Sequence, residues 1–373
     1  MANDSLILLT GKESARYIVL DLLRGLAAIA VLLYHANYML GSYALNLHKG
    51  YLAVDFFFML SGFVISANYH ATVRGSISWP DFLSVRVARL WPLFLLSTLL
   101  GAVAVVVKLT RDSGYFDAYG VLSSLAVNGL MLPSFFQAYG VDRLFVFNGA
   151  SWSVFFEVLI NLVFFAFLRT QPLKTMCILS AAFAGFLSVM AQANGSLDGG
   201  WSAATFHVGS ARVLFGFTAG MAVYLIGRHL RFHSDGPAAL VPGAGLALSF
   251  FLNGNWLVDC ALVILAFPLL LLLASRGHLT GLWARLGGRL GDISYSVYLL
   301  QTPAMLFAAG ACQKFSGQKI AGFAPVSGVL FITGLLGISF LSWRYFELPA
   351  QRLIRRRLGS RQQRPSRIPE RVA

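Results

Sequence analysis

Residues 17–40 read YIVLDLLRGLAAIAVLLYHANYML, an apolar run that carries three ionisable side chains, Asp21, Arg24 and His35. About 20 apolar residues are enough for a helix to cross the hydrocarbon core of a bilayer. The run therefore predicts a membrane-spanning helix. Residues 1–16 before it are polar and do not have the pattern of a cleavable signal peptide, so we expect this first span to be retained.

The composition of the whole chain also indicates a membrane protein. Of its 373 residues, 57% are apolar and only 12% are charged, whereas soluble globular domains carry about 25% charged residues. A mean hydropathy of +0.70 excludes an ordinary soluble enzyme and a disordered protein. The net charge of +14 would suggest nucleic-acid binding in a soluble protein. Here the basic residues lie between apolar runs, as membrane orientation requires, so no nucleic-acid partner is expected.

Ten apolar segments are long enough to span a membrane, which predicts an all-α integral membrane protein with about ten transmembrane helices. The segments are 17–40, 50–69, 90–108, 151–168, 175–193, 205–227, 237–252, 256–273, 293–311 and 321–345. Residues 120–136 are less apolar, and we expect an interfacial or re-entrant helix there. The predicted organisation is a cytoplasmic N-terminal segment (1–16), a membrane domain (17–350) and a basic cytoplasmic tail (351–373).

The distribution of basic residues predicts the orientation. With ten spans and the N-terminus inside, 22 Lys and Arg residues fall on the cytoplasmic side and six on the outer side. This bias follows the positive-inside rule and predicts that both termini are cytoplasmic. The cysteines Cys177, Cys260 and Cys312 show no metal-ligand or disulfide spacing, so no metal site is expected.

Four ionisable residues from four predicted spans lie at one depth near the outer surface. Asp55, Glu157 and Arg212 lie roughly 7–11 Å below that surface by helix rise, and His35 lies at a similar depth. An unpaired charge inside a membrane is costly, so the layer predicts either two structural ion pairs or a functional site. In a functional site, His35 would be the base or nucleophile and a carboxylate would orient it.

A second cluster lies on the predicted inner face. Arg86 and Arg89 are one helical turn apart, just before Trp91. Together with Arg24 they could hold a phosphorylated cytosolic donor, because guanidinium groups bind phosphate well. The alternative is a set of arginines that only extend toward the membrane interface. Arg24 and His35 are 11 residues apart, which is roughly 16 Å along a helix axis.

Several of these residues belong to a series of motifs in a fixed order. The motifs are LDLLRGLAA (20–28) closed by His35, VDFFFMLSGFVI (54–65), RVARLWP (86–92), SWSVFFE (151–157), RVLFGFTAG (212–220), SYSVYL (294–299) and ELP (347–349). The series resembles the membrane acyltransferase family 3 proteins, which O-acylate bacterial surface glycans, Nod factors and some small molecules. The resemblance covers residues 17–350. One position departs from it, because Gln301 stands where family members often have histidine.

The resemblance implies transfer of an acyl group, acetyl by default, from cytosolic acyl-CoA to a hydroxyl of a glycan, a lipid-linked sugar or a related acceptor. It implies a bacterial inner-membrane location, acyl-CoA as co-substrate and no permanently bound cofactor. His35 would deprotonate the acceptor or carry the acyl group, Asp55 or Glu157 would set its tautomer, and Arg212 would stabilise the oxyanion. The expected donor-binding residues are Arg24, Arg86 and Arg89, and the expected substrate-lining residues are Ser61, Trp152, Ser153, Tyr295 and Tyr298.

Two other function classes are open. One is a transporter or flippase that uses the intramembrane charges as a gating network, and the other is a non-catalytic scaffold in an envelope assembly. A transporter has no special need for a histidine and would be expected to show repeats or discontinuous helices. A scaffold would be expected to have lost the histidine or its carboxylate partners, and all of them are present.

Overall fold

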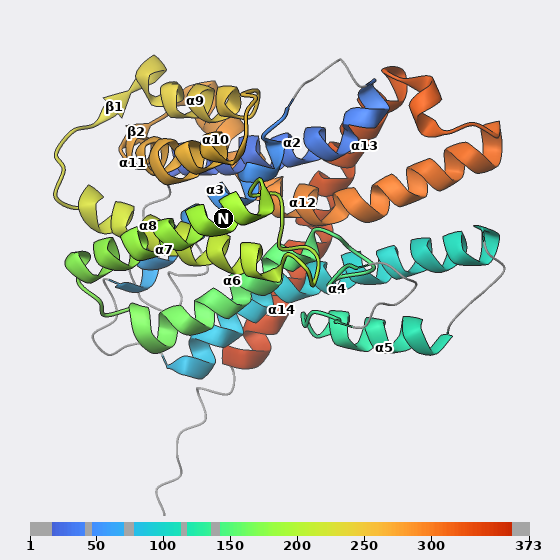
Figure 1. Ribbon diagram of the computed structural model, residues 1–373, viewed down its shortest axis with the longest axis horizontal. Coiled ribbons are helices and arrows are strands. Elements are labelled where there is room, and N and C mark those ends of the chain that lie inside the picture. Colours follow the sequence, from blue (N-terminus) through green and yellow to red (C-terminus); the bar gives the residue numbers. More distant parts are fainter. Residues whose placement is uncertain (1–16, 42–46, 71–77, 113–117, 136–141, 360–373) are drawn as a thin grey trace, which may run out of the picture.

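The computed structural model describes residues 17–41, 47–70, 78–112, 118–135 and 142–359. Nearly all secondary structure within these ranges is helical (Figure 1). The prediction of an all-α membrane protein is confirmed, whereas the count of ten spans and the orientation of the termini stay predictions. The expected N-terminal segment and the end of the basic tail, residues 360–373, lie outside the described residues.

The helices follow one another along the chain, and the connections between them differ in length. They are α2 (Ile18–Leu40), α3 (Ala53–Ile65), α4 (Trp79–Asp112), α5 (Ala118–Gly129), α6 (Ser151–Val163), α7 (Leu173–Asn194), α8 (Phe206–Gly227), α9 (Val241–Ser249), α10 (Trp256–Cys260), α11 (Phe267–Ser275), α12 (Gly281–Ser316), α13 (Val326–Ser342) and α14 (Leu348–Gly359). Short 3₁₀ or π turns are η1 (Gly50–Leu52), η2 (Ser66–His70), η4 (Phe164–Leu168), η5 (Gly236–Leu240), η6 (Ala261–Ala266), η7 (Ile320–Phe323) and η8 (Trp343–Glu347). Two two-residue strands, β1 (Ser234–Asp235) and β2 (Gly277–His278), pair in parallel.

Eight helical segments in the described ranges are long and apolar enough to cross a membrane. They are Ile18–Asn37, Gly50–His70, Trp79–Thr110, Ser151–Leu168, Leu173–Asn194, Phe206–Gly227, Trp256–Ser275 and Val326–Ile354, and each overlaps a predicted span. The predicted span 237–252 corresponds to a shorter apolar helix, Gly236–Ser249. The predicted span 293–311 lies within the 36-residue helix α12, where buried polar residues such as Ser294, Ser296 and Gln301 lower the mean hydropathy.

Two helix boundaries differ from the sequence expectation. Helix α4 begins at Trp79, eleven residues before the predicted span at 90–108, so Arg86 and Arg89 lie within the helix. The hydroxyl of Ser78 accepts a hydrogen bond from the backbone N–H of Asp81 (3.4 Å), a capping contact that begins this helix. Near the C-terminus, helix α14 continues through Gly359, so the first residues of the expected basic tail are helical.

Close helix contacts build the core. Helix α2 packs most extensively on α12, and α3 packs on α8. In the second pair a side chain on Gly62 would overlap the carbonyl of Phe217, and one on Gly220 would overlap the carbonyl of Met59. These glycines allow the two backbones to touch, as small residues do in membrane helix pairs. The contact fixes the helices that carry Asp55 and Arg212.

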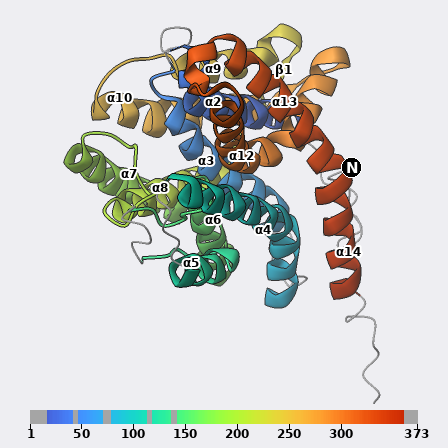
Figure 2. The same ribbon diagram turned by 90° about the vertical axis from the view of Figure 1, so that its right-hand side faces the viewer.

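The remaining helices surround these two pairs. Helices α9, α10 and α11 gather with the short strands in one corner of the molecule, next to α2 (Figure 1). Helix α5, from the region predicted as an interfacial helix at 120–136, lies beside α4 (Figure 2). Helix α13 packs on both α2 and α12. Helix α2 is therefore enclosed by α3, α9, α12 and α13, and it carries His35 in its last part.

Candidate active site

His35 lies in the last part of α2, and its ring is exposed although the neighbouring Leu32 and Ala36 are buried. Its Nδ1 is 3.3 Å from Oε1 of Gln301 on α12. The Gln301 side chain is fully buried, and its amide nitrogen donates to the carbonyl of Tyr298 at 2.9 Å. The oxygen of this fixed amide can only accept, so Nδ1 of His35 donates the proton. Nε2 then carries the lone pair, which is the tautomer that a general base needs.

Asp55 and Arg212 form a buried ion pair. Arg212 Nε donates to Oδ1 of Asp55 at 3.0 Å, and Nη2 donates to Oδ2 at 2.7 Å. The guanidinium also donates to the carbonyls of Tyr51 and Gly199, at 2.9 and 2.8 Å. Four of its five N–H groups are thereby directed to protein oxygens. Both side chains are at most 1% exposed.

This pairing differs from two expectations about the outer layer, and the catalytic roles themselves stay predictions. The structure brings Asp55 to Arg212, and Gln301 takes the place beside His35 that was expected for Asp55 or Glu157. Arg212 was expected to stabilise an oxyanion, but its donors already bind protein groups, and its guanidinium lies over the ring of Trp152 at 5.1 Å. The physical reason is the cost of a buried unpaired charge, which a bidentate partner offsets.

Glu157 is half-buried on α6, and its Oε1 accepts a hydrogen bond from the hydroxyl of Ser61 at 3.1 Å. Its charge acts on Arg86 and on the phenols of Tyr295 and Tyr298. Glu157 therefore faces the part of the bundle that contains Arg86.

The other expected lining residues hold helices together. The hydroxyl oxygens of Ser153 and Tyr298 are 2.7 Å apart, which links α6 to α12. The phenol of Tyr295 donates to the carbonyl of Leu90 at 2.7 Å, which links α12 to α4. Trp152 packs edge-on against Phe58 and lies under Arg212. Ser61 contacts Glu157, and Tyr295 lies beside Leu90, where the charge of Arg89 acts on it.

The three expected donor-binding arginines have different environments. Arg24 donates to Asp21 (2.7 Å), to the carbonyl of Gly291 (2.8 Å) and to the hydroxyl of Ser294 (3.1 Å). These bonds tie α2 to α12. Arg89 is exposed on α4. Arg24 therefore links α2 to α12.

Arg86 is the buried member of the set. Its guanidinium lies over the rings of Tyr69 and Phe82, at 5.4 and 5.5 Å. Among the described residues its Nε has no hydrogen-bond partner, although the residue is only 7% exposed. A buried unpartnered donor is costly, and a bound anion would satisfy it.

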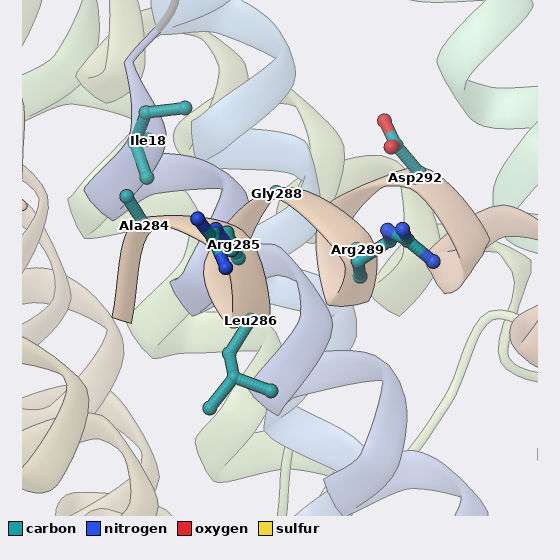
Figure 3. Close-up of a pocket in the computed structure, with 7 residues that line it drawn as sticks. All are labelled: Ile18, Ala284, Arg285, Leu286, Gly288, Arg289 and Asp292. Carbon is teal, nitrogen blue, oxygen red and sulfur yellow. The ribbon is translucent and has the colours of Figure 1, made fainter. Parts of the chain in front are cut away.

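A shallow pocket of about 310 Å³ lies where the start of α2 meets α12. Figure 3 shows Arg285 and Arg289 on successive turns of α12, with Ile18 of α2 beside them. Asp292, which follows Gly291 and its bond to Arg24, also lines the pocket. The pocket therefore places two further arginines near the Arg24 end of α2.

A protein-family model described as an acyltransferase domain matches residues 17–344. The chain belongs to this family. The acyltransferase is 34% identical over 185 residues to "Protein 2 in picA locus" of Rhizobium radiobacter, a match that covers 47% of this chain and 95% of that protein. It is 25% identical over 383 residues to the O-acetyltransferase OatA of Staphylococcus aureus strain NCTC 8325 / PS 47, covering 91% of this chain. The same OatA match is found in strain COL.

The acyltransferase spans only 58% of the length of these OatA relatives. No solved structure matches it. The family membership confirms the resemblance expected from the motifs and identifies the chain as an acyltransferase.

Two residues beside His35 in the acyltransferase had no assigned role in the sequence interpretation. Gln301 was visible only as a departure from the family pattern, although a polar residue within an apolar run is a signal in itself. Asp198 lies in the loop between α7 and α8, and its charge acts on His35. No sequence signal marked it, because it lies outside the apolar runs and is 163 residues from His35.

Proposed function

We propose that this acyltransferase moves an acetyl group from cytosolic acetyl-CoA to a hydroxyl of a glycan, a lipid-linked sugar or a related acceptor, in the inner membrane of a bacterium. The observation that carries the proposal is the contact between His35 Nδ1 and Gln301 Oε1 at 3.3 Å. It leaves Nε2 of an exposed imidazole as a base. The name of the OatA relatives supports acetyl as the transferred group and oxygen as the accepting atom.

The arginines of α4 support the binding of a phosphorylated donor at the cytoplasmic side of the membrane. Arg86 has an unpartnered buried Nε, and Arg89 is exposed one turn further along α4. Both lie in the part of α4 that precedes the predicted apolar span. Acetyl-CoA carries several phosphate groups, and guanidinium groups bind them by charge-assisted hydrogen bonds. The donor would thus be held through its phosphates at the cytoplasmic side.

The distance between the two regions suits the length of the donor. Arg24 and His35 both lie on α2, 11 residues apart, which is roughly 16 Å along the helix. An extended pantetheine arm can bridge that length. Phosphates near the arginines would allow the thioester to reach the histidine.

In direct transfer, Nε2 of His35 accepts the proton of the acceptor hydroxyl while the oxygen attacks the thioester carbonyl. The C–O bond of the new ester forms, the C–S bond breaks, and the proton passes from the imidazolium to the departing CoA thiolate. In the covalent variant, Nε2 first attacks the thioester, so the N–C bond forms, the C–S bond breaks and CoA departs as a thiolate. The acceptor hydroxyl then attacks the acetyl-imidazolium, the C–O bond forms, the C–N bond breaks, and the hydroxyl proton passes to the CoA thiolate. Gln301 holds the ring in the same tautomer for both routes.

The proposal is tested with sealed inverted membrane vesicles that contain the protein. Acetyl-CoA labelled in the acetyl group is supplied to the exposed cytoplasmic face, and label is followed into the glycan and lipid fractions. The proposed function predicts ester-linked label that mild base releases. Label-free glycan and lipid, together with movement of an unmodified substrate across the membrane, would support the transporter alternative instead.

A further inference from the structure

Asp198 is linked to the segment that carries His35 through Tyr34, the residue before it. Its Oδ2 accepts a hydrogen bond from the hydroxyl of Tyr34, with an O–O distance of 3.4 Å. The ring centroids of Tyr34 and His35 are 5.4 Å apart. Two charges act on His35, the negative charge of Asp198 and the positive charge of Arg143. Arg143 is exposed whereas Asp198 is half-buried, so water screens the arginine more strongly.

A buried ion pair fixes the chain on one side of Asp198. The backbone N–H of Leu197 donates to Oδ2 of Asp259 at 2.9 Å. Oδ1 of Asp259 is 2.6 Å from the ammonium of Lys49, and both side chains are at most 5% exposed. The phenol of Tyr51 donates to the same carboxylate at 2.8 Å. Leu197 is therefore held by a network of charges that water does not reach.

The second buried ion pair fixes the chain on the other side. The carbonyl of Gly199 accepts a hydrogen bond from Nη1 of Arg212 at 2.8 Å, and Arg212 is paired with Asp55. Asp198 therefore lies between two residues whose backbone groups are bound to buried charges. Such a connection gives a loop carboxylate a defined position, as preorganised sites require.

We propose that Asp198 is a positioning residue whose carboxylate stabilises the imidazolium of His35 during acetyl transfer. The two buried ion pairs, in turn, hold the loop that carries Asp198. The inference rests on the proposed function, because it assigns a role within the same reaction.

The proton balance defines the step at which Asp198 acts. When Nε2 of His35 takes the proton of the acceptor hydroxyl, the neutral ring becomes a cation. The fixed carboxylate lowers the energy of that cation and keeps its own charge, so no proton passes to Asp198. The proton later leaves His35 with the CoA thiolate, and the ring is neutral again.

The test measures kcat and the KM for acetyl-CoA in three variants with the labelled-acetyl assay. Asp198→Asn keeps the side-chain shape and an oxygen that can accept from Tyr34, but removes the charge. Asp198→Glu restores the charge, and Tyr34→Phe removes the hydrogen bond while it leaves the charge. The matched control is Asp142→Asn in a neighbouring loop, whose carboxylate accepts from the backbone N–H groups of Ala203 and Ala204.

The expected result for Asp198→Asn is a kcat at least about tenfold below wild type with an unchanged KM for acetyl-CoA. Asp198→Glu, Tyr34→Phe and the Asp142 control are expected to stay within about threefold of wild type. Equal activity of Asp198→Asn and wild type would overturn the inference and leave the proposed function intact. A loss in Asp198→Glu or Tyr34→Phe as large as that in Asp198→Asn would also overturn it, since shape or hydrogen bonding would then be the cause. A wild-type protein that transfers no acetyl group would overturn the proposed function, and the inference with it.

Discussion

Asp55 on α3 and Arg212 on α8 form a bidentate ion pair in the interior of the helix bundle, with N–O distances of 3.0 and 2.7 Å. The same guanidinium donates to the carbonyl of Gly199, next to Asp198. Two residues for which the sequence predicted catalytic roles thus connect the core of the bundle to the loop that carries Asp198.

Removal of one member of this pair is expected to destabilise the protein. Asp55→Ala leaves the Arg212 charge buried without its partner, a change that typically costs about 3–5 kcal/mol in the free energy of unfolding. The double variant Asp55→Leu/Arg212→Met is expected to recover much of this loss, because neither charge remains. Thermal unfolding in detergent measures both. A stable but inactive Asp55→Ala protein would contradict the structural role.

Gln301 is expected to affect turnover through the orientation of His35. Gln301→Leu keeps a similar volume but removes the acceptor for Nδ1, so we expect kcat to fall by about tenfold to a hundredfold. The exposed Gln313 on the same helix provides the control Gln313→Leu, which should act like wild type. Normal turnover in Gln301→Leu would show that the contact with His35 has no role in the reaction.

Arg86 is expected to act on donor binding. Arg86→Met preserves the packing against Tyr69 and Phe82 but removes the donors, so the KM for acetyl-CoA should rise by about tenfold. Arg169→Met is the matched control, because Arg169 also lies over an aromatic ring, that of Phe165. If Arg86→Met has an unchanged KM for the donor, the phosphate role of this residue is excluded.

Variants of Glu157 and Ser61 distinguish two roles for the Glu157 carboxylate, one in the reaction and one only in holding the helices together. Glu157→Gln keeps an acceptor for Ser61 and removes the charge that acts on Arg86, so we expect turnover to fall by at least about tenfold. Ser61→Ala, which removes the hydrogen bond and leaves the charge, should lower it by less than about threefold. Full activity together with reduced thermal stability in Glu157→Gln would favour a purely structural pair with Ser61.

The sequence predicts the membrane helices well because length and apolar composition are local properties. The predicted helix boundaries are wrong where interactions other than the burial of apolar residues extend a helix. Helix α4 begins at Trp79 because Ser78 caps it, and a search for apolar residues alone starts at residue 90. The polar half of α12 likewise belongs to one continuous helix, which an apolar window does not include.

The charged residues inside the membrane helices were predictable from the sequence, but their partners were not. Depth along a helix follows from residue spacing, which predicted Asp55, Glu157, Arg212 and His35 at one level. In the structure the partner of Glu157 is Ser61, six residues beyond Asp55 on α3. Which of them pair depends on how α3 and α8 cross, and that crossing is set by the glycine contacts at Gly62 and Gly220. The contact between Asp198 and Tyr34 depends on the path of a loop, which no local pattern in the sequence describes.

The most direct test of the account is the rate of acetyl transfer in membranes that contain His35→Gln, compared at matched protein levels with wild type and with His278→Gln. His278 is an exposed residue of β2, and its ring makes a long 3.9 Å contact with Asp235. His35→Gln is expected to lower the rate by about a hundredfold or more, and His278→Gln is expected to have the wild-type rate. Equal rates for all three proteins would contradict a catalytic role of His35, because its imidazole would then have no part in the transfer.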